Sequence, residues 1–95
     1  MTQSVAGAKI TDVGINRGVN SAWIHFTSGV TGTPPVPGAD GYFGFDLSNA
    51  LDLQLWRLAL AAQVQSLPVL VQGTGSASPG SPWEAVSYLS YNAPQ

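Results

Sequence analysis

The residue types that most often carry out catalysis are scarce in this sequence. His25 is the single histidine, and there is no cysteine. No nucleophile or carboxylate stands at a spacing that ties it to His25, so a surface or interface role explains this side chain better than a role as general base. One histidine without cysteine also disfavours a transition-metal site. We therefore expect a protein that is not an enzyme and that has neither a metal nor another cofactor.

The five acidic residues are too scattered to form a carboxylate site. A calcium loop or the carboxylate pair of a glycoside hydrolase requires clustered acidic side chains. The acidic residues are Asp12, Asp40, Asp46, Asp52 and Glu84. Asp46 and Asp52 flank the expected start of a helix, where negative charge is favourable. Structural roles therefore explain them better than catalysis or metal binding.

Charged residues make up only 8% of the chain, well below the roughly 25% of ordinary soluble domains. Three basic residues against five acidic ones leave no electrostatic footprint for nucleic acid, so this ligand is excluded. A surface with so few charges is poorly protected against association, which favours a homo-oligomer. No apolar run reaches the roughly 18 residues needed to cross a membrane, so no membrane insertion is expected.

Two polar segments carry the groups that recognise a neutral sugar. They combine amide, hydroxyl and guanidinium groups with one indole, and an aromatic plane can stack on the apolar face of a sugar ring. The candidate ligand-binding residues are Asn16, Arg17, Asn20, Ser76, Ser78, Ser81 and Trp83. Arg17 would suit the carboxylate of a sialic acid. The alternative is that these are ordinary turn residues.

Five strands and one helix are predicted to hold these segments. Apolar and polar residues alternate, or nearly so, in the expected strands, and a one-residue slip at Thr11-Asp12 indicates a bulge in the first. The strands are expected at residues 8–16, 22–27, 42–47, 67–72 and 83–91. The helix follows the capping residues Ser48 and Asn49 and runs to Gln65. Residues 28–41 and 73–82 are predicted loops, and residues 1–7 a flexible N-terminus.

Three strands, a helix and two strands, in this order, are the plan of the oligonucleotide/oligosaccharide-binding fold. The predicted fold class is therefore mostly β, a five-stranded barrel with one helix between strands three and four, in a single domain over residues 1–95. In this plan the loop joining strands one and two and the loop joining strands four and five share one end of the barrel. The candidate residues of both segments would meet there.

The helix has two apolar stripes, and each needs a partner. At 100° per residue, the first stripe contains Leu51, Leu55, Leu58, Ala59 and Ala62, which the barrel is expected to cover. The nearly opposite stripe is the expected oligomer interface and contains Leu53, Trp56, Leu60 and Val64. The alternative, that a long loop of the same chain covers this second stripe, is disfavoured because the loops are polar.

Four segments resemble, in order and spacing, the B subunits of pertussis-like and subtilase-like bacterial A-B toxins. They are residues 9–13 (KITDV), 22–26 (AWIHF), 58–62 (LALAA) and 83–89 (WEAVSYL). The resemblance implies a barrel that assembles as a ring of five around its helices, binds cell-surface glycans and accompanies a separate catalytic subunit. It also implies a secreted protein, although residues 1–7 lack the features of a signal peptide.

The function expected from the sequence is that of a non-catalytic, ring-forming glycan-binding module. The alternative comes from another class: a structural assembly protein, such as a phage or secretion-particle component, with no sugar ligand. Sugar preference on a glycan array would separate the two.

Overall fold

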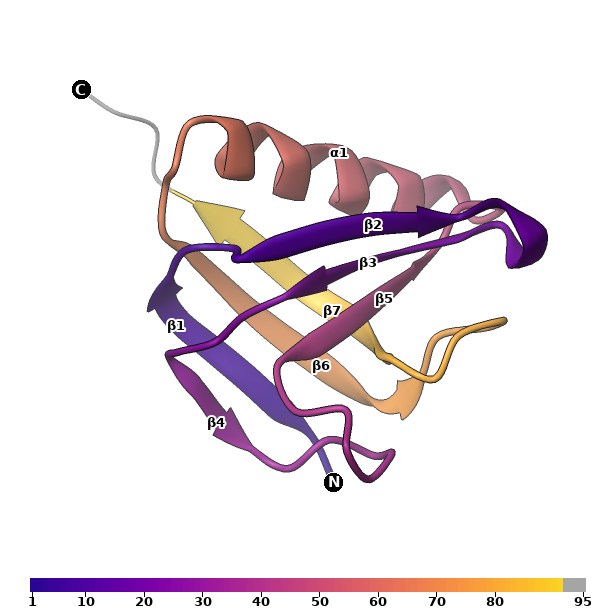
Figure 1. The fold of residues 1–95 in the computed structure, drawn as a ribbon, viewed down its shortest axis with the longest axis horizontal. Coiled ribbons are helices and arrows are strands. Elements are labelled where there is room, and N and C mark those ends of the chain that lie inside the picture. The colour runs from indigo at the N-terminus through magenta and orange to yellow at the C-terminus, as the bar shows by residue number, and fades with distance from the viewer. Residues whose placement is uncertain (92–95) are drawn as a thin grey trace.

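The computed structural model describes residues 1–91, which form seven strands and one long helix (Figure 1). The strands are β1 (Gln3–Ala8), β2 (Asp12–Asn16), β3 (Ser21–His25), β4 (Val30–Gly32), β5 (Tyr42–Asp46), β6 (Val69–Ala77) and β7 (Glu84–Tyr91). A short 3-10 helix, η1 (Arg17–Val19), joins β2 to β3, and the helix α1 (Ala50–Val64) lies between β5 and β6. The sequence-based prediction of a mostly β fold with one helix is confirmed.

All seven strands belong to one sheet with the order β2-β3-β5-β7-β6-β1-β4. Neighbouring strands are antiparallel except β5 and β7, which run parallel and pair Phe43 with Glu84 and Gly44 with Ala85. Strands β2 and β4 are the two ends of the order, and no pairing within residues 1–91 joins them. The sheet is therefore not closed, and the expected five-stranded barrel is not confirmed.

The predicted first strand, residues 8–16, is only partly a strand in the structure: Asp12–Asn16 form β2, whereas Ala8 is the last residue of β1, a strand that was not predicted. Residues 9–11 separate β1 from β2, at the position where the alternation slips, and the two strands pair at opposite ends of the sheet. β1 pairs with β6, whereas β2 pairs with β3. Because only three residues connect strands that lie so far apart in the sheet order, the sheet must curl around its inner face, as Figure 1 shows.

Three expected boundaries are corrected by the strand pairing. The N-terminus is not a flexible segment throughout, since Gln3–Ala8 form β1 between β6 and β4. The expected loop at residues 28–41 contains the short strand β4, and the expected loop at residues 73–82 contains the end of β6, which continues to Ala77. Glycines in both regions disfavour strands locally, and the pairing with neighbouring strands overrides this preference.

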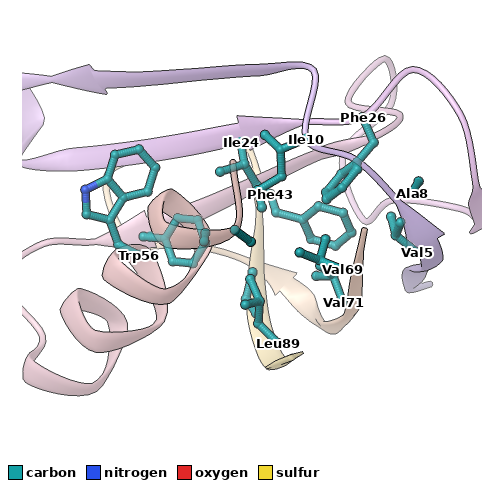
Figure 2. Close-up of a cluster of buried hydrophobic side chains, with 14 of the residues drawn as sticks. Val5, Ala8, Ile10, Ile24, Phe26, Phe43, Trp56, Val69, Val71 and Leu89 are labelled. Carbon is teal, nitrogen blue, oxygen red and sulfur yellow. The ribbon is translucent and has the colours of Figure 1, made fainter. Parts of the chain in front are cut away.

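The core lies between the inner face of the curled sheet and α1 (Figure 2). Strand alternation places Ala22, Ile24 and Phe26 on this inner face, as the sequence predicts, and all three are buried. Phe43 and Phe45 of β5 are fully buried beside them. Phe26 and Phe43 meet edge to face with ring centroids 6.0 Å apart, a favourable geometry for aromatic pairs.

Asn49 caps α1 and fixes where it begins. Its side-chain Oδ1 accepts hydrogen bonds from the backbone N–H groups of Leu51 and Asp52, both at 3.0 Å, which satisfies two donors that have no partner within the helix. Asp52 Oδ2 accepts a hydrogen bond from the backbone N–H of Asp46 at 2.8 Å. This bond ties the first turn of the helix to the end of β5. No helix within residues 1–91 has the length and apolar character required to span a membrane.

The orientation of α1 differs from the one expected. The helix turns the border between its two apolar stripes toward the sheet, so that Trp56 of one stripe and Ala59 of the other are both buried. Trp56 is only 5% exposed and packs on Phe45 with ring centroids 5.6 Å apart. The prediction that Trp56 faces another subunit is therefore wrong. Asp52 lies on this border, and the hydrogen bond that its carboxylate accepts from the backbone N–H of Asp46 is consistent with this orientation.

This rotation leaves apolar side chains exposed on both sides of the helix. Leu51 and Leu58, which were expected against the sheet, are exposed on one side, and Leu51 is 68% exposed. Val64 of the expected interface is 78% exposed on the other side. Of the remaining members of that interface, Leu53 and Leu60 are half-buried and pack against the core.

Candidate functional site

The outer face of the sheet carries a row of stacked aromatic rings. The imidazole of His25 stacks on the phenol ring of Tyr42, with centroids 4.0 Å apart and planes 12° apart. The indole of Trp83 stacks on Tyr42 with centroids 4.3 Å apart and planes 18° apart. Trp23 meets Tyr42 edge-on at 6.0 Å. We call His25, Tyr42 and Trp83 the aromatic stack.

Strand register brings these rings together. Alternation along β3 directs Trp23 and His25 to the face opposite the buried Ile24, and the β3–β5 register places Tyr42 beside His25. Trp83 immediately precedes β7, whose first residue pairs with Phe43 of the parallel strand β5. Trp83 therefore lies next to Tyr42. The stack combines residues from three chain segments that only the fold makes neighbours.

Two glycines leave room for the indoles. A side chain at Gly14 of β2 would collide with the ring of Trp23, which lies over it. A methyl carbon at Gly44 of β5 would stand 2.9 Å from Ser81 Oγ and 3.2 Å from Trp83 Cβ. Because real Cβ atoms almost never approach so closely, glycine at both positions lets side chains lie flat on the sheet.

Asp12 lies at one end of the stack and orients the histidine. Its Oδ2 is 3.1 Å from His25 Nδ1, and the two residues are paired across β2 and β3. A carboxylate acceptor favours the tautomer of His25 that carries a proton on Nδ1. The side chain of Asp12 is 56% exposed, so the contact adds little stability in itself. Its effect is to hold the imidazole plane parallel to Tyr42.

The two loops predicted to share an end of the molecule do approach each other. A methyl carbon on Gly80, between β6 and β7, would stand 3.2 Å from the backbone oxygen of Val19 in η1. Both loops lie at the right of Figure 1. The loop after β2 and the loop before β7 are thus neighbours, and Trp83 belongs to the second.

The polar residues of the first loop have separate structural partners. Asn16 Oδ1 accepts a hydrogen bond from the backbone N–H of Gly18 at 3.0 Å and caps η1. Asn20 has a left-handed backbone, and its Nδ2 donates to Ser48 Oγ at 2.5 Å. Arg17 is exposed and forms no ion pair within residues 1–91. Of these three predicted residues, Arg17 is the one whose side chain is uncommitted.

The three predicted serines differ in what they offer a ligand. Ser76 is exposed on β6. Ser81 is half-buried, and its Oγ accepts a hydrogen bond from the backbone N–H of Trp83 at 3.0 Å, which fixes the approach to the stack. Ser78 is buried, and its Oγ has no hydrogen-bond partner among the described residues. Ser78 therefore supports the loop from beneath instead of facing outward.

Gln3 of β1 holds the stack from behind. Its Nε2 donates to the backbone oxygen of Tyr42 at 2.8 Å, and its Oε1 accepts from the backbone N–H of Gly41 at 3.0 Å. The side chain is 1% exposed. Because an unsatisfied buried amide is costly, these bonds fix the backbone at the start of β5. The central ring of the stack thus depends on the N-terminal strand.

Glu84, next to Trp83, is a fully buried carboxylate. Its Oε2 accepts from Thr2 Oγ1 at 2.7 Å and from the backbone N–H of Gly75 at 2.8 Å, and its Oε1 accepts from the backbone N–H of Gln3 at 3.2 Å. Gly73 makes space for the carboxylate, since any side chain there would collide with it. These bonds tie β1, β6 and the start of β7 together directly beneath the loop that carries Trp83.

The sequence-based prediction missed Tyr42 and Trp23 as site residues and assigned no ligand role to His25. The alternation in residues 22–27 does place Trp23 and His25 on one outer face, but only the strand order reveals that Tyr42 and Trp83 join them. No group of three or more potential metal ligands occurs in residues 1–91. A hollow of about 350 Å³ beside Pro68 and Tyr91 includes none of the stacked residues.

Comparisons of the chain with protein families, curated proteins and solved structures give no significant match.

Proposed function

We propose that the chain is a non-catalytic glycan-binding module that works as a homo-oligomer. The observation that carries the proposal is the aromatic stack on the outer face of the sheet, beside two polar loops. Sugars bind through the stacking of their apolar faces on aromatic rings and through hydrogen bonds from uncharged groups. The face combines both kinds of contact.

Trp83 is the proposed centre of the site. It is half-buried and ends the stack, because Tyr42 is the single ring that pairs with it among residues 1–91. One face of the indole is therefore not occupied by another ring. The exposed Arg17 supplies a cation in the neighbouring loop for an acidic sugar. Asn16 Nδ2 and Asn20 Oδ1, the amide atoms that are not used in the structural bonds, and the hydroxyls of Ser76 and Ser81 supply uncharged hydrogen-bonding groups. Ser78 is left out of the proposed contact set because it is buried.

The proposed fold is the oligosaccharide-binding barrel with a bent first strand. β1 and β2 would be its two halves, one paired with β6 and the other with β3. With β1 and β2 counted as one strand and β4 as an addition, α1 lies between the third and fourth strands. The parallel pairing of β5 with β7 supports this reading, as does the proximity of the two loops.

The proposed assembly is a ring, with five copies on the resemblance to toxin B subunits. A ring requires two different surfaces on each subunit, one for each neighbour. The exposed sides of α1 support this arrangement, since Leu51 and Leu58 lie on one side and Val64 on the other. Individual sugar sites are often weak, and repetition in a ring raises avidity by roughly 10²–10⁴. A separate catalytic subunit remains part of this proposal.

The same exposed apolar residues favour the second candidate function, a structural assembly protein without a sugar ligand. A glycan array probed with the purified protein tests the choice. Binding to a restricted set of glycans supports the proposed module. Absence of binding to every glycan, at protein concentrations where the oligomer is present, contradicts it and favours the structural role.

A further inference from the structure

The outer edge of β2 is open to a partner strand. β2 is five residues long and pairs with β3 over its whole length, and no other strand within residues 1–91 pairs with it. An open edge presents a row of backbone donors and acceptors, and proteins usually protect such edges with lysine, proline or a very short strand. β2 contains neither lysine nor proline. Asp12, at its first residue, is the one charged residue of β2, so the rest of this edge has none of these protections.

The strand at the other end of the sheet is protected in two of these ways. β4 has three residues, Val30–Gly32, and the prolines Pro34 and Pro35 follow it closely. Proline lacks the backbone N–H that a neighbouring strand would use. The contrast between β4 and β2 marks β2 as the edge that is suited to pairing with another chain.

Ile15 of β2 is an inner-face residue without a cover. It pairs with Ala22 of β3, which pairs with Phe45 of β5, and both of these residues are fully buried. Ile15 belongs to the same inner row, yet it is 60% exposed. A neighbouring strand on the open side of β2 would cover it by extending this row.

A second copy of β2 complements the first. When two β2 strands run antiparallel about Gly14, all five residues of each strand are paired. Val13 then lies opposite the partner's Ile15 on the inner face, and Asp12 lies opposite the partner's Asn16 on the outer face. Asp12, with its side chain 56% exposed, stands one residue from the partner's Arg17. Opposite charges approach and no like charges meet, which favours this register.

We infer that two copies of this chain associate through their β2 strands, antiparallel and centred on Gly14. The contact is isologous, because the same surface serves both copies. It joins two sheets into one and places the two Trp23 indoles, each lying over its own Gly14, on the same outer face. Two aromatic stacks would then face one way. This contact is separate from the sides of α1, and it holds whether or not the face binds sugar.

A paired cysteine variant tests the register. The chain has no cysteine, so Asp12→Cys with Asn16→Cys introduces only thiols at residues that would lie opposite each other. Residues opposed in antiparallel strands have Cα atoms about 4.5–5.5 Å apart, which suits a disulfide. Within one chain, positions 12 and 16 of an extended strand are about 13 Å apart, too far for a disulfide.

Mild oxidation with diamide, followed by non-reducing electrophoresis, should give a band at twice the chain mass for the double variant. Neither single variant should give that band, because each cysteine faces the native residue at the other position. A double variant that stays at the mass of one chain overturns the inference. Equal cross-linking of the single variants also overturns it, because it shows random collision.

The mass of the protein in solution provides a second test without cysteine. Ile15→Lys places a charge at the proposed contact and should lower the mass measured by light scattering at least twofold. Leu70→Lys is the matched control, since Leu70 is also a partly exposed apolar residue but lies on β6, inside the sheet order. An unchanged mass for Ile15→Lys, or an equal loss in both variants, contradicts the inference. Neither the cross-linking nor the mass measurement involves glycan binding. A negative result in either therefore argues against the β2 contact and leaves the proposed glycan-binding function untouched.

Discussion

The indole of Trp83 stacks on the phenol ring of Tyr42, with centroids 4.3 Å apart and planes 18° apart. The two residues belong to different strand ends, and the parallel pairing of β5 with β7 makes them neighbours. Gln3 donates a hydrogen bond to the backbone oxygen of Tyr42, and the buried carboxylate of Glu84, the residue after Trp83, accepts one from the backbone N–H of Gln3. The arrangement of the outer face therefore depends on buried hydrogen bonds.

Replacing Gly14 with alanine should displace Trp23. The added methyl group would collide with the indole, and Trp23 is packed against Tyr42. Overpacking of this kind costs about 1–3 kcal/mol in the free energy of unfolding. The near-ultraviolet circular dichroism spectrum should also change, because the environment of the Trp23 indole changes. Gly18→Ala is the control, since Gly18 has an ordinary backbone and only Asn16 Oδ1 nearby; an equal effect of both substitutions contradicts the prediction.

The substitution Glu84→Gln should destabilise the fold. In glutamine an NH2 group replaces one of the two carboxylate oxygens. It then faces the backbone N–H of either Gln3 or Gly75, so that buried N–H loses its acceptor. The expected loss is about 1–3 kcal/mol in the free energy of unfolding, measured by urea denaturation. Asp40→Asn makes the same chemical change at an exposed loop residue and should have little effect. Equal stability of Glu84→Gln and the native protein would show that the bonds to the carboxylate contribute nothing.

Trp56→Ala should destabilise the chain itself and not only its assembly. Trp56 is buried against Phe45 in the core, and truncation of a buried tryptophan costs about 3–5 kcal/mol. The exposed Gln54 on the same helix supplies the control Gln54→Ala, with a change expected within about 0.5 kcal/mol. If the Trp56→Ala variant is monomeric and as stable as the native protein, Trp56 belongs to the subunit interface and not to the core.

Local patterns predicted much of this fold, because they report on single elements. The alternation in residues 22–27 identified the buried face of β3, and the capping residue Asn49 located the start of α1. The one-residue slip at Thr11-Asp12, which was interpreted as a bulge, lies where the irregular residues 9–11 end and β2 begins. These features depend on side chains that are close in sequence.

The remaining features depend on contacts between distant segments. The rotation of α1 follows the hydrogen bond between Asp52 and the backbone of Asp46, and two apolar stripes of similar size gave no basis for predicting it. β1 was missed because its residues are mostly small, and its order depends on buried hydrogen bonds to distant residues: Gln3 donates to the backbone oxygen of Tyr42 and to the carboxylate of Glu84. The stack was missed because its three rings come from separate segments that only the strand order brings together.

The central claim, that the aromatic stack binds sugar, is tested most directly with Trp83→Ala. The variant should keep its oligomeric state and lose at least tenfold in affinity for a multivalent display of the glycan that the native protein prefers, which corresponds to about 1.4 kcal/mol or more. Tyr88→Ala is the matched control, because Tyr88 is an exposed aromatic residue of β7 outside the stack. Undiminished binding by Trp83→Ala, with its assembly intact, would contradict the proposed site.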